Sequence, residues 1–257
     1  MAYVKPKKKL GQHFLKDQGI AQDIVDLLSG HQNYKYLLEI GPGTGVLTKL
    51  LLPREDFQLR VIEIDTESVD FLLKELKVHP TQVIEGDFLR LPADTYFGEN
   101  DYAIIGNFPY NISSQIFFKV LENRNQIKEV VGMVQKEVGE RICAGPGGKT
   151  CGILSIFMQA FYECDYEFTV PPDVFNPPPK VHSGVIRLRR NEVKELGCDE
   201  KQFFRIVKQG FNNRRKTLRN ALKSLNIPKE DMQDPLFAKR AEQLSVADFV
   251  YICNLLA

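Results

Sequence analysis

The segment Glu39-Ile-Gly-Pro-Gly-Thr-Gly45 follows a short apolar run, Tyr36–Ile40, and opens a helical pattern. Glycines let the backbone approach a ligand closely, and the amides at the start of a helix remain free to bind it. The segment therefore predicts the first strand, loop and helix of an α/β ligand-binding sheet. A dinucleotide site fits less well, because its Gly-x-Gly-x-x-Gly pattern requires a third glycine where Val46 stands.

Apolar runs alternate with helical patterns on both sides of this segment. We expect further strands at Leu59–Ile64, Gln82–Ile84, Tyr102–Ile105, Val130–Val134, Tyr162–Val170 and Ser183–Arg190. Helical spacing of apolar residues marks Ile20–Leu28, Thr66–Leu76 and Ser113–Leu121. Repeated strand–helix units predict a doubly wound sheet that binds its ligands at the carboxyl ends of the strands.

The pattern changes after Arg190, since only helical periodicity follows. Helices are expected at Lys201–Gly210, Arg214–Leu225, Leu236–Gln243 and Val246–Leu256, the last with Ser245 as its N-cap and Asp248 as capping partner. We therefore expect a catalytic domain over residues 1–194, including a basic N-terminal arm, and a small all-helical domain over residues 195–257.

The bulk composition is that of an ordinary soluble protein, with 43% hydrophobic and 26% charged residues among 257. No apolar run approaches the length of a membrane span, and no secretory signal follows Met1. The five cysteines show no C-x-x-C spacing. These features predict a reduced cytoplasmic protein without a metal site or a membrane partner.

Basic charge is concentrated at the two ends of the chain, although the net charge is only +1. Five lysines precede the first acid, Asp17, and eight basic residues without an acid lie between Lys201 and Lys223. Two such segments favour a polyanionic partner over two solvated faces, without distinguishing RNA, DNA or an anionic membrane. We expect Arg214, Arg215 and Lys216 to begin a helix, where cations oppose the helix dipole unless a phosphate binds there.

Carboxylates are placed at the ends of two successive strands. Glu63 ends the second strand and can accept both hydroxyls of a ribose. Asp87 ends the third strand and can accept an adenine amine, with Phe88 against the ring. Following the glycine-rich loop, this pair indicates a nucleoside-containing cofactor.

The sequence Gly106-Asn-Phe-Pro-Tyr-Asn-Ile-Ser113 follows the fourth strand. An adenine N6 amine is a poor nucleophile, because its lone pair is delocalised into the ring. The oxygen of Asn107 and a nearby backbone carbonyl can accept its hydrogens and favour the tetrahedral geometry that attack on a methyl sulfonium requires. Tyr110 offers a face for base stacking.

At this point the chain resembles the small-subunit rRNA adenine dimethyltransferases, the KsgA family, over essentially its full length. Besides the two motifs above, the resemblance rests on Leu10-Gly-Gln-His-Phe-Leu15, Val61-Ile-Glu-Ile-Asp65, Val134-Gln-Lys-Glu-Val-Gly-Glu-Arg-Ile142 and Val174-Phe-Asn-Pro-Pro-Pro-Lys-Val-His-Ser183. It implies a seven-stranded Rossmann-like S-adenosylmethionine methyltransferase sheet with a helical C-terminal domain. It also implies an rRNA (adenine-N6,N6-)-dimethyltransferase, monomeric and active in ribosome biogenesis. Its substrates would be two adjacent adenosines near the 3′ end of 16S rRNA in the immature small ribosomal subunit.

The resemblance also implies roles for individual residues. His13 and Leu15 would close over S-adenosylmethionine, Gly41 would approach its methionine part, Glu63 its ribose and Asp87 its adenine. His13 departs from the Asn that is usual in bacterial relatives, so a backbone contact is expected there rather than a side-chain contact.

The remaining roles concern the target base. Asn107 would contact both cofactor and base, and Phe175 would stack on the flipped adenine opposite Tyr110. Phe108 stands where Leu is commoner, with little effect expected, because the mechanism uses its carbonyl. His182, often an acid in relatives, is assigned no role.

Three alternatives remain. One is a 23S rRNA adenine dimethyltransferase of the macrolide-resistance type, which the Gly-Pro-Gly loop and the Gly-Gln-His-Phe-Leu arm fit less well. A DNA adenine methyltransferase is disfavoured by the C-terminal half. A non-catalytic RNA-binding assembly factor or transcription factor on the same fold could lose the cofactor acids or the Asn-x-Pro-Tyr turn, all of which are present here.

Overall fold

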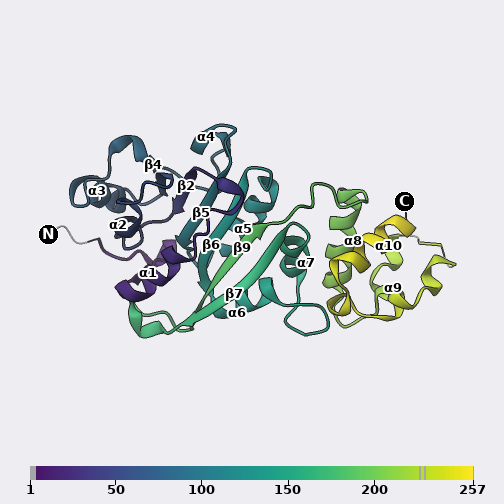
Figure 1. Ribbon diagram of the computed structural model, residues 1–257. Helices are drawn as coiled ribbons and strands as arrows, with labels where there is room; N and C mark the ends of the chain where they lie inside the picture. The colour runs from purple at the N-terminus through teal and green to yellow at the C-terminus, as the bar shows by residue number, and fades with distance from the viewer. Residues whose placement is uncertain (1–3, 226, 229, 257) are drawn as a thin grey trace. The chain divides into compact units, whose positions relative to one another are not determined.

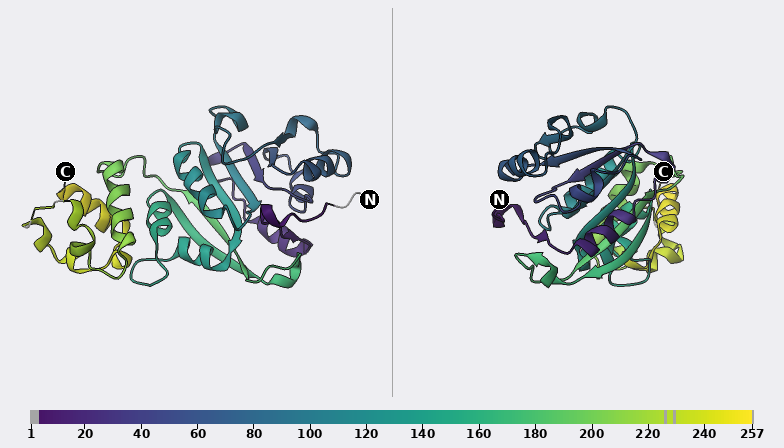
Figure 2. Two further views of the ribbon diagram at one scale, coloured as in Figure 1. Left: turned by 180° about the vertical axis from the view of Figure 1, so that it is seen from behind. Right: turned by 60° about the vertical axis from the view of Figure 1, so that its left-hand side comes forward.

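A seven-stranded sheet is the main structural element of the protein (Figure 1), whose computed structural model describes residues 4–225, 227–228 and 230–256. In sheet order the strands are β4 (Val83–Glu85), β3 (Gln58–Glu63), β2 (Tyr36–Ile40), β5 (Tyr102–Asn107), β6 (Ile127–Gln135), β9 (Ser183–Arg190) and β7 (Tyr162–Val170). The first five are parallel, and β9 pairs antiparallel with β6. The predicted seven-stranded α/β fold is confirmed, and Figure 2 shows the strands side by side from two further directions.

Both faces of the central strands are buried, which explains their almost continuous apolar sequences. Leu37, Val61 and Ile105 face one core together with residues of α1 (Gln18–Asp26) and α2 (Thr48–Leu51). Their neighbours along the strands, such as Leu38 and Ile104, are fully buried on the opposite side. Successive strand residues point to opposite faces, so both sides of the sheet are covered. The remaining helices of this part are α3 (Thr66–Lys74), α4 (Asp94–Phe97) and α5 (Ser113–Glu122).

A second, two-stranded sheet was not predicted. β1 (Phe14–Leu15) pairs antiparallel with β8 (Phe175–Asn176), which joins the N-terminal arm to the proline-rich segment. Short 3-10 turns lie at Lys8–Leu10, His31–Asn33, Pro80–Gln82, Pro172–Val174, Lys223–Leu225, Asp231–Gln233, Pro235–Ala238 and Ala241–Gln243.

The chain divides into two compact units, one of Met1–Gly139 with Cys164–Arg190 and the other of Glu140–Glu163 with Asn191–Ala257. The second unit therefore includes residues 140–163, which the expected boundary after residue 194 left with the first. The physical reason is α7 (Ile153–Gln159), because Phe157 packs on Phe203 and Phe204 of α8 (Glu200–Asn212), with ring centroids 6.4 and 4.5 Å away. α6 (Lys136–Cys143) spans the first junction.

The helical unit differs from its prediction in two places. The expected helix Arg214–Leu225 is reduced to α9 (Leu218–Ala221) and a 3-10 turn, and the expected helix Leu236–Gln243 is two 3-10 turns. α10 (Val246–Leu255) is confirmed with its capping box, in which Ser245 Oγ accepts from the Asp248 amide at 3.1 Å.

The basic cluster 214–216 lies after the end of α8 and before α9. Cations after a helix C-terminus complement the helix dipole, so the expectation that they oppose it was wrong. Arg214 is moreover held internally, since its Nε donates to the Glu242 carboxylate at 2.7 Å and its Nη2 to the Cys151 carbonyl at 2.9 Å.

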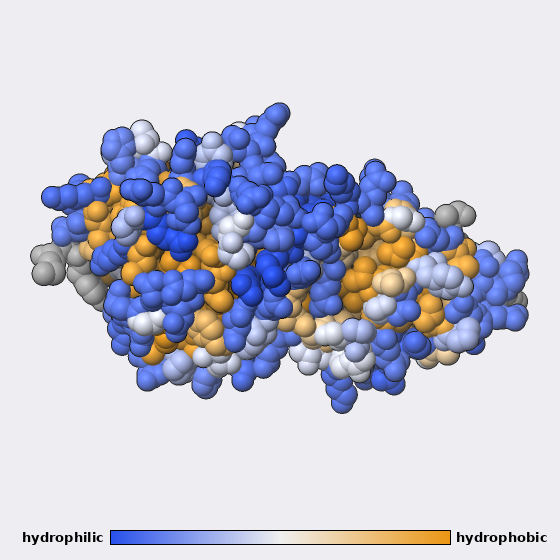
Figure 3. Space-filling view, in the orientation of Figure 1, coloured by the Kyte–Doolittle hydropathy of each residue, from blue (hydrophilic) through white to orange (hydrophobic). Residues whose placement is uncertain are grey.

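Hydrophilic residues cover most of the face shown in Figure 3, and apolar residues form patches between them. Among the described residues the large hydrophobic side chains that are exposed are Ile64, Val181 and Tyr251. None of the described helices has the length and apolar character needed to cross a bilayer.

Candidate active site

A cavity opens at the carboxyl ends of β2, β3, β4 and β5. Its lining comes from Ile40, Gly41 and Gly43, from Ile62–Ile64, from residues 86–89, from Asn107–Ile112, and from Leu10–Phe14 of the arm. β3 and β4 are added on one side of β2, and β5 then begins the other half of the sheet on the opposite side of β2. Open α/β sheets bind ligands at the carboxyl ends of the two strands where the strand order reverses in this way. The predicted residues His13, Gly41, Glu63, Asp87, Asn107 and Tyr110 all line this cavity.

Glu63 holds the glycine-rich loop in place. Its carboxylate accepts from the amide of Gly43 at 3.0 Å and from those of Ile64 and Asp65 at 2.9 Å. Burial raises the pKa of Glu63, and the three amides partly offset that rise. Gly43 itself has a positive φ of 56°, and an added Cβ would lie 2.7 Å from the ring of Phe14. The loop therefore requires glycine there, because the arm closes over it.

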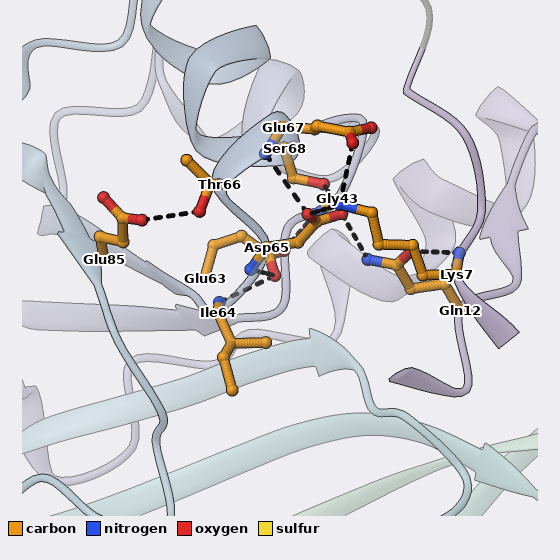
Figure 4. A network of polar contacts seen from close by, with 10 residues as sticks. All are labelled: Lys7, Gln12, Gly43, Glu63, Ile64, Asp65, Thr66, Glu67, Ser68 and Glu85. Atoms are coloured by element: carbon orange, nitrogen blue, oxygen red, sulfur yellow. Dashed lines mark hydrogen bonds and ion pairs between the residues drawn. The ribbon is translucent and has the colours of Figure 1, made fainter. Parts of the chain in front are cut away.

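Asp65 joins the arm to the end of β3, as Figure 4 shows. Its carboxylate pairs with Lys7 and accepts from Gln12 Nε2 at 3.2 Å. Burial alone would raise the pKa of Asp65, but the hydrogen bonds from Lys7 and Gln12 hold it below its ordinary value. We call these three residues the arm clasp. Sequence reasoning missed it, although Asp65 belongs to one of the motifs that carried the resemblance.

Asp87 lies at the cavity after β4. One carboxylate oxygen accepts from the amide of Leu89 at 2.9 Å, and the other pairs with exposed Arg90 at 3.3 Å. The neighbouring Phe88 is 4% exposed and stacks on Tyr96, with centroids 5.7 Å apart. One carboxylate and one aromatic ring are thus fixed at the same cavity wall.

Asn107 ends β5, and its Nδ2 donates to the carbonyl of His13 at 2.8 Å. A carbonyl can only accept, so this bond fixes which side of the amide carries nitrogen and leaves Oδ1 as an acceptor. The next residue, Phe108, is fully buried, and a Cβ at Gly132 would lie 2.4 Å from its ring. Gly132 thus provides the space that this Phe requires.

Tyr110 forms the outer wall with His13. Their rings stack with centroids 5.5 Å apart, and the Tyr110 hydroxyl lies 2.6 Å from Ser183 Oγ. His13 Nδ1 lies 2.7 Å from the carbonyl oxygen of Pro177. The backbone carbonyl of His13 thus accepts from Asn107, and its ring contacts Tyr110 and Pro177. A backbone contact of His13 with the cofactor stays a prediction.

Two predicted site residues lie elsewhere. Leu15 and Phe175 are 3% and 1% exposed and belong to the main hydrophobic core. They face each other in the β1–β8 pair, whose alternation places their side chains inward. In this structure Phe175 therefore does not oppose Tyr110, because a ring enclosed by core side chains has no free face for a base.

A family model for ribosomal RNA adenine dimethylase matches residues 4–257. The chain belongs to the ribosomal RNA adenine dimethylase family. A relative within this family is the ribosomal RNA small subunit methyltransferase A of Cytophaga hutchinsonii, which is 58% identical over 100% of this chain and 99% of its own length.

Solved structures related to this adenine dimethylase agree with the fold. A dimethyladenosine transferase from Plasmodium falciparum superposes with a TM-score of 0.77 at 28% identity, covering 93% of this chain and 96% of that one. The 23S rRNA methyltransferase ErmE superposes with a TM-score of 0.68 at 23% identity, covering 94% and 99%, and so shows a shared fold.

Proposed function

We propose that this chain transfers methyl groups to the N6 amines of two adjacent adenosines near the 3′ end of 16S rRNA, giving N6,N6-dimethyladenosine. The methyl donor is S-adenosylmethionine. The observation that carries the proposal is Asn107, whose oriented amide lies at the same cavity as the two strand-end carboxylates Glu63 and Asp87.

The cavity has the chemistry that this donor requires. Glu63 and Asp87 can accept from the ribose hydroxyls and the adenine amine, and Ile62, Ile64 and Phe88 offer apolar contact. None of the described residues that line it is Lys or Arg. Two acids without a basic side chain suit a cationic sulfonium nucleoside and disfavour a cofactor with phosphates.

Asn107 would prepare the nucleophile. The bound donor supplies an electrophilic methyl group. Oδ1 of Asn107 and the carbonyl of Phe108 accept the two amine hydrogens and favour a tetrahedral nitrogen with an available lone pair. The buried ring of Phe108 and its amide bond to the Met133 carbonyl, at 3.0 Å, hold that carbonyl in place. After methylation the nitrogen is acidic and releases its proton to water.

Sequence identity to relatives favours small-subunit rRNA as the substrate over the alternative substrates. The relative that is 58% identical is named a small subunit methyltransferase, and the 23S enzyme is 23% identical. The intact Asn107 turn and acids favour catalysis over a purely binding role. The immature small subunit in the cytoplasm is the expected partner, with the protein acting as a monomer. Lys201, Arg205 and Lys208 are exposed at helical spacing on α8 and are suited to the RNA phosphates.

The direct test is Asn107→Ala on small subunits that lack dimethyladenosine. We expect kcat to fall at least about 100-fold, because the amine loses an acceptor that orients it. Primer-extension mapping would locate the product on 16S rRNA, and circular dichroism and subunit binding would show an intact fold. Turnover close to that of the unaltered chain would place the chemistry elsewhere.

A further inference from the structure

A second recess adjoins the cofactor cavity, and we call it the outer groove. The two share Gly11, Gln12, His13 and Tyr110, and the stacked His13–Tyr110 pair forms the wall between them. The other side of the groove is formed by the proline-rich segment up to Val181. Phe175, expected at the site, is buried at this segment's start, whereas Pro177, Pro178 and Lys180 after it are exposed.

The groove carries positive charge without compensation. Lys8 and Lys180 line it, and none of the described residues that line it is Asp or Glu. Both lysines are exposed and form no ion pair with another described residue. The contrast with Lys7 is informative, since Lys7 is bound to Asp65 in the arm clasp. Adjacent lysines of the arm therefore have different surroundings, one paired internally and one at the groove.

The same groove has an apolar side. Val181 is 44% exposed, and Pro177 and Pro178 are exposed beside it. Proline offers a rigid apolar surface and has no N–H to satisfy. Single-strand nucleic-acid sites combine cations for the phosphates with ring faces on which bases stack. The groove has the two lysines and the rings of His13 and Tyr110 in its lining, and Val181 and the prolines add apolar contact.

The position of the groove identifies its occupant. The groove lies next to the cavity that holds Asn107, with the His13–Tyr110 pair lining both, so a chain that delivers a base past Tyr110 has the groove beside it. The bond of His13 to the Pro177 carbonyl ties that pair to the prolines, so both walls are fixed to each other. We propose that the outer groove binds the RNA nucleotides immediately next to the target adenosine, with phosphates on Lys8 and Lys180 and a neighbouring base against Val181. This inference rests on the proposed function.

The first test is kinetic and uses the full chain with under-methylated small subunits. The double variant Lys8→Glu, Lys180→Glu should raise KM for subunits about tenfold or more, while kcat at saturation and affinity for S-adenosylmethionine stay within about twofold. The matched control is Lys9→Glu with Lys16→Glu, which makes the same charge change on the arm outside the groove. An equal rise in KM for the control pair would show general electrostatic attraction and overturn the groove.

The second test locates the RNA. A photoreactive amino acid replacing Val181 should cross-link to 16S rRNA, with reverse-transcription stops one to about three nucleotides from a methylated adenosine. Cross-links confined to distant nucleotides or to ribosomal protein, or no RNA cross-link, would overturn the proposal. Failure of the proposed function itself is distinguishable, since the unaltered chain would then leave the subunits unmethylated.

Discussion

Two buried glutamates flank the glycine-rich loop and differ in their hydrogen-bond donors. Glu63 accepts from the backbone amides of three residues, whereas Glu39 is bonded, among the described residues, by Thr48 alone, whose Oγ1 donates at 2.7 Å. Burial raises the pKa of Glu39 to about 8, with Thr48 lowering it only in part. Glu39 is therefore largely neutral at pH 7 and anchors α2. Glu63 instead holds the glycine-rich loop and the end of β3 through backbone amides.

Glu39 should make stability depend on pH. Its folded pKa of about 8 exceeds its ordinary value of 4.5, so its contribution is complete below pH 4.5 and is lost as pH rises towards 8. Glu39→Gln keeps an acceptor for Thr48 without this loss. Urea unfolding at pH 5.5 and pH 8 should show that the variant loses about 2 kcal/mol less stability than the unaltered chain. Equal losses would contradict the assignment.

A second prediction for a single residue concerns Asp87. Asp87→Ala should weaken S-adenosylmethionine binding about fivefold or more, because removing a partner of a buried polar group costs about 1–3 kcal/mol. Calorimetric titration measures this. The control is Glu85→Ala, which removes an exposed acid that bonds Thr66 at 3.0 Å and does not line the cavity. Comparable affinities for the two variants would remove Asp87 from the cofactor site.

Among the elements, the N-terminal arm has the least regular structure and the most connections to the site. It is fixed by the arm clasp, by β1 pairing with β8, and by the bonds of His13 to Asn107 and Pro177. Residues from distant parts of the sequence thus meet along one short segment. The arm closes one side of the cofactor cavity.

Removing the arm clasp should loosen this closure. Lys7→Met deletes the ion pair with Asp65 but leaves the bond that the Asp65 carboxylate accepts from the Glu67 amide, which caps α3. We expect faster amide hydrogen exchange over residues 7–15, unchanged exchange in α3, and faster dissociation of S-adenosylmethionine. Lys9→Met, at an exposed neighbour, serves as the control. Exchange identical in both variants would show that the clasp does not hold the arm.

The strands of the main sheet were predictable because parallel strands that are buried on both faces consist of nearly continuous apolar residues. β2, β7 and β9 have the predicted bounds, and the other predicted strands shift by one to three residues. β1 and β8 were missed because two residues show no periodicity. The clasp was missed because Lys7 and Asp65 are 58 residues apart and neither pattern points to the other. The burial of Phe175 in the core was not foreseen, because its motif does not show which side of β8 faces inward.

At the scale of the whole molecule, the basic side chains of the helical unit are of two kinds. Some form bonds within the fold, and others are exposed to solvent. Arg214 is engaged with Glu242 and Cys151, and Arg219 with the Met232 carbonyl at 2.8 Å. Arg215 and Lys216 are exposed and form no ion pair with other described residues. The sequence provides no basis for distinguishing these four residues as RNA ligands, because it does not show which cations form hydrogen bonds or ion pairs within the fold.

This difference predicts two phenotypes from adjacent residues. Arg215→Glu with Lys216→Glu should weaken binding to small subunits and reduce the salt slope by about two, with stability and cofactor affinity unchanged. Arg214→Glu should instead lower the unfolding temperature, because Glu242 loses its partner. Filter binding across salt concentrations and thermal unfolding measure the two effects. Normal subunit binding by the double variant would mean that Arg215 and Lys216 form only a solvated face.

The wall formed by His13 and Tyr110 has a consequence for the order of events. Each methyl transferred consumes one donor molecule, so dimethylating an adenosine requires two donors in succession. With the donor in the cavity that the arm lines and the RNA strand in the proposed outer groove, the two would lie on opposite sides of this wall. A spent donor would then have an exit on its own side of the wall that does not require the strand to leave. This arrangement predicts processive dimethylation, in which the singly methylated base stays in place for its second methyl group.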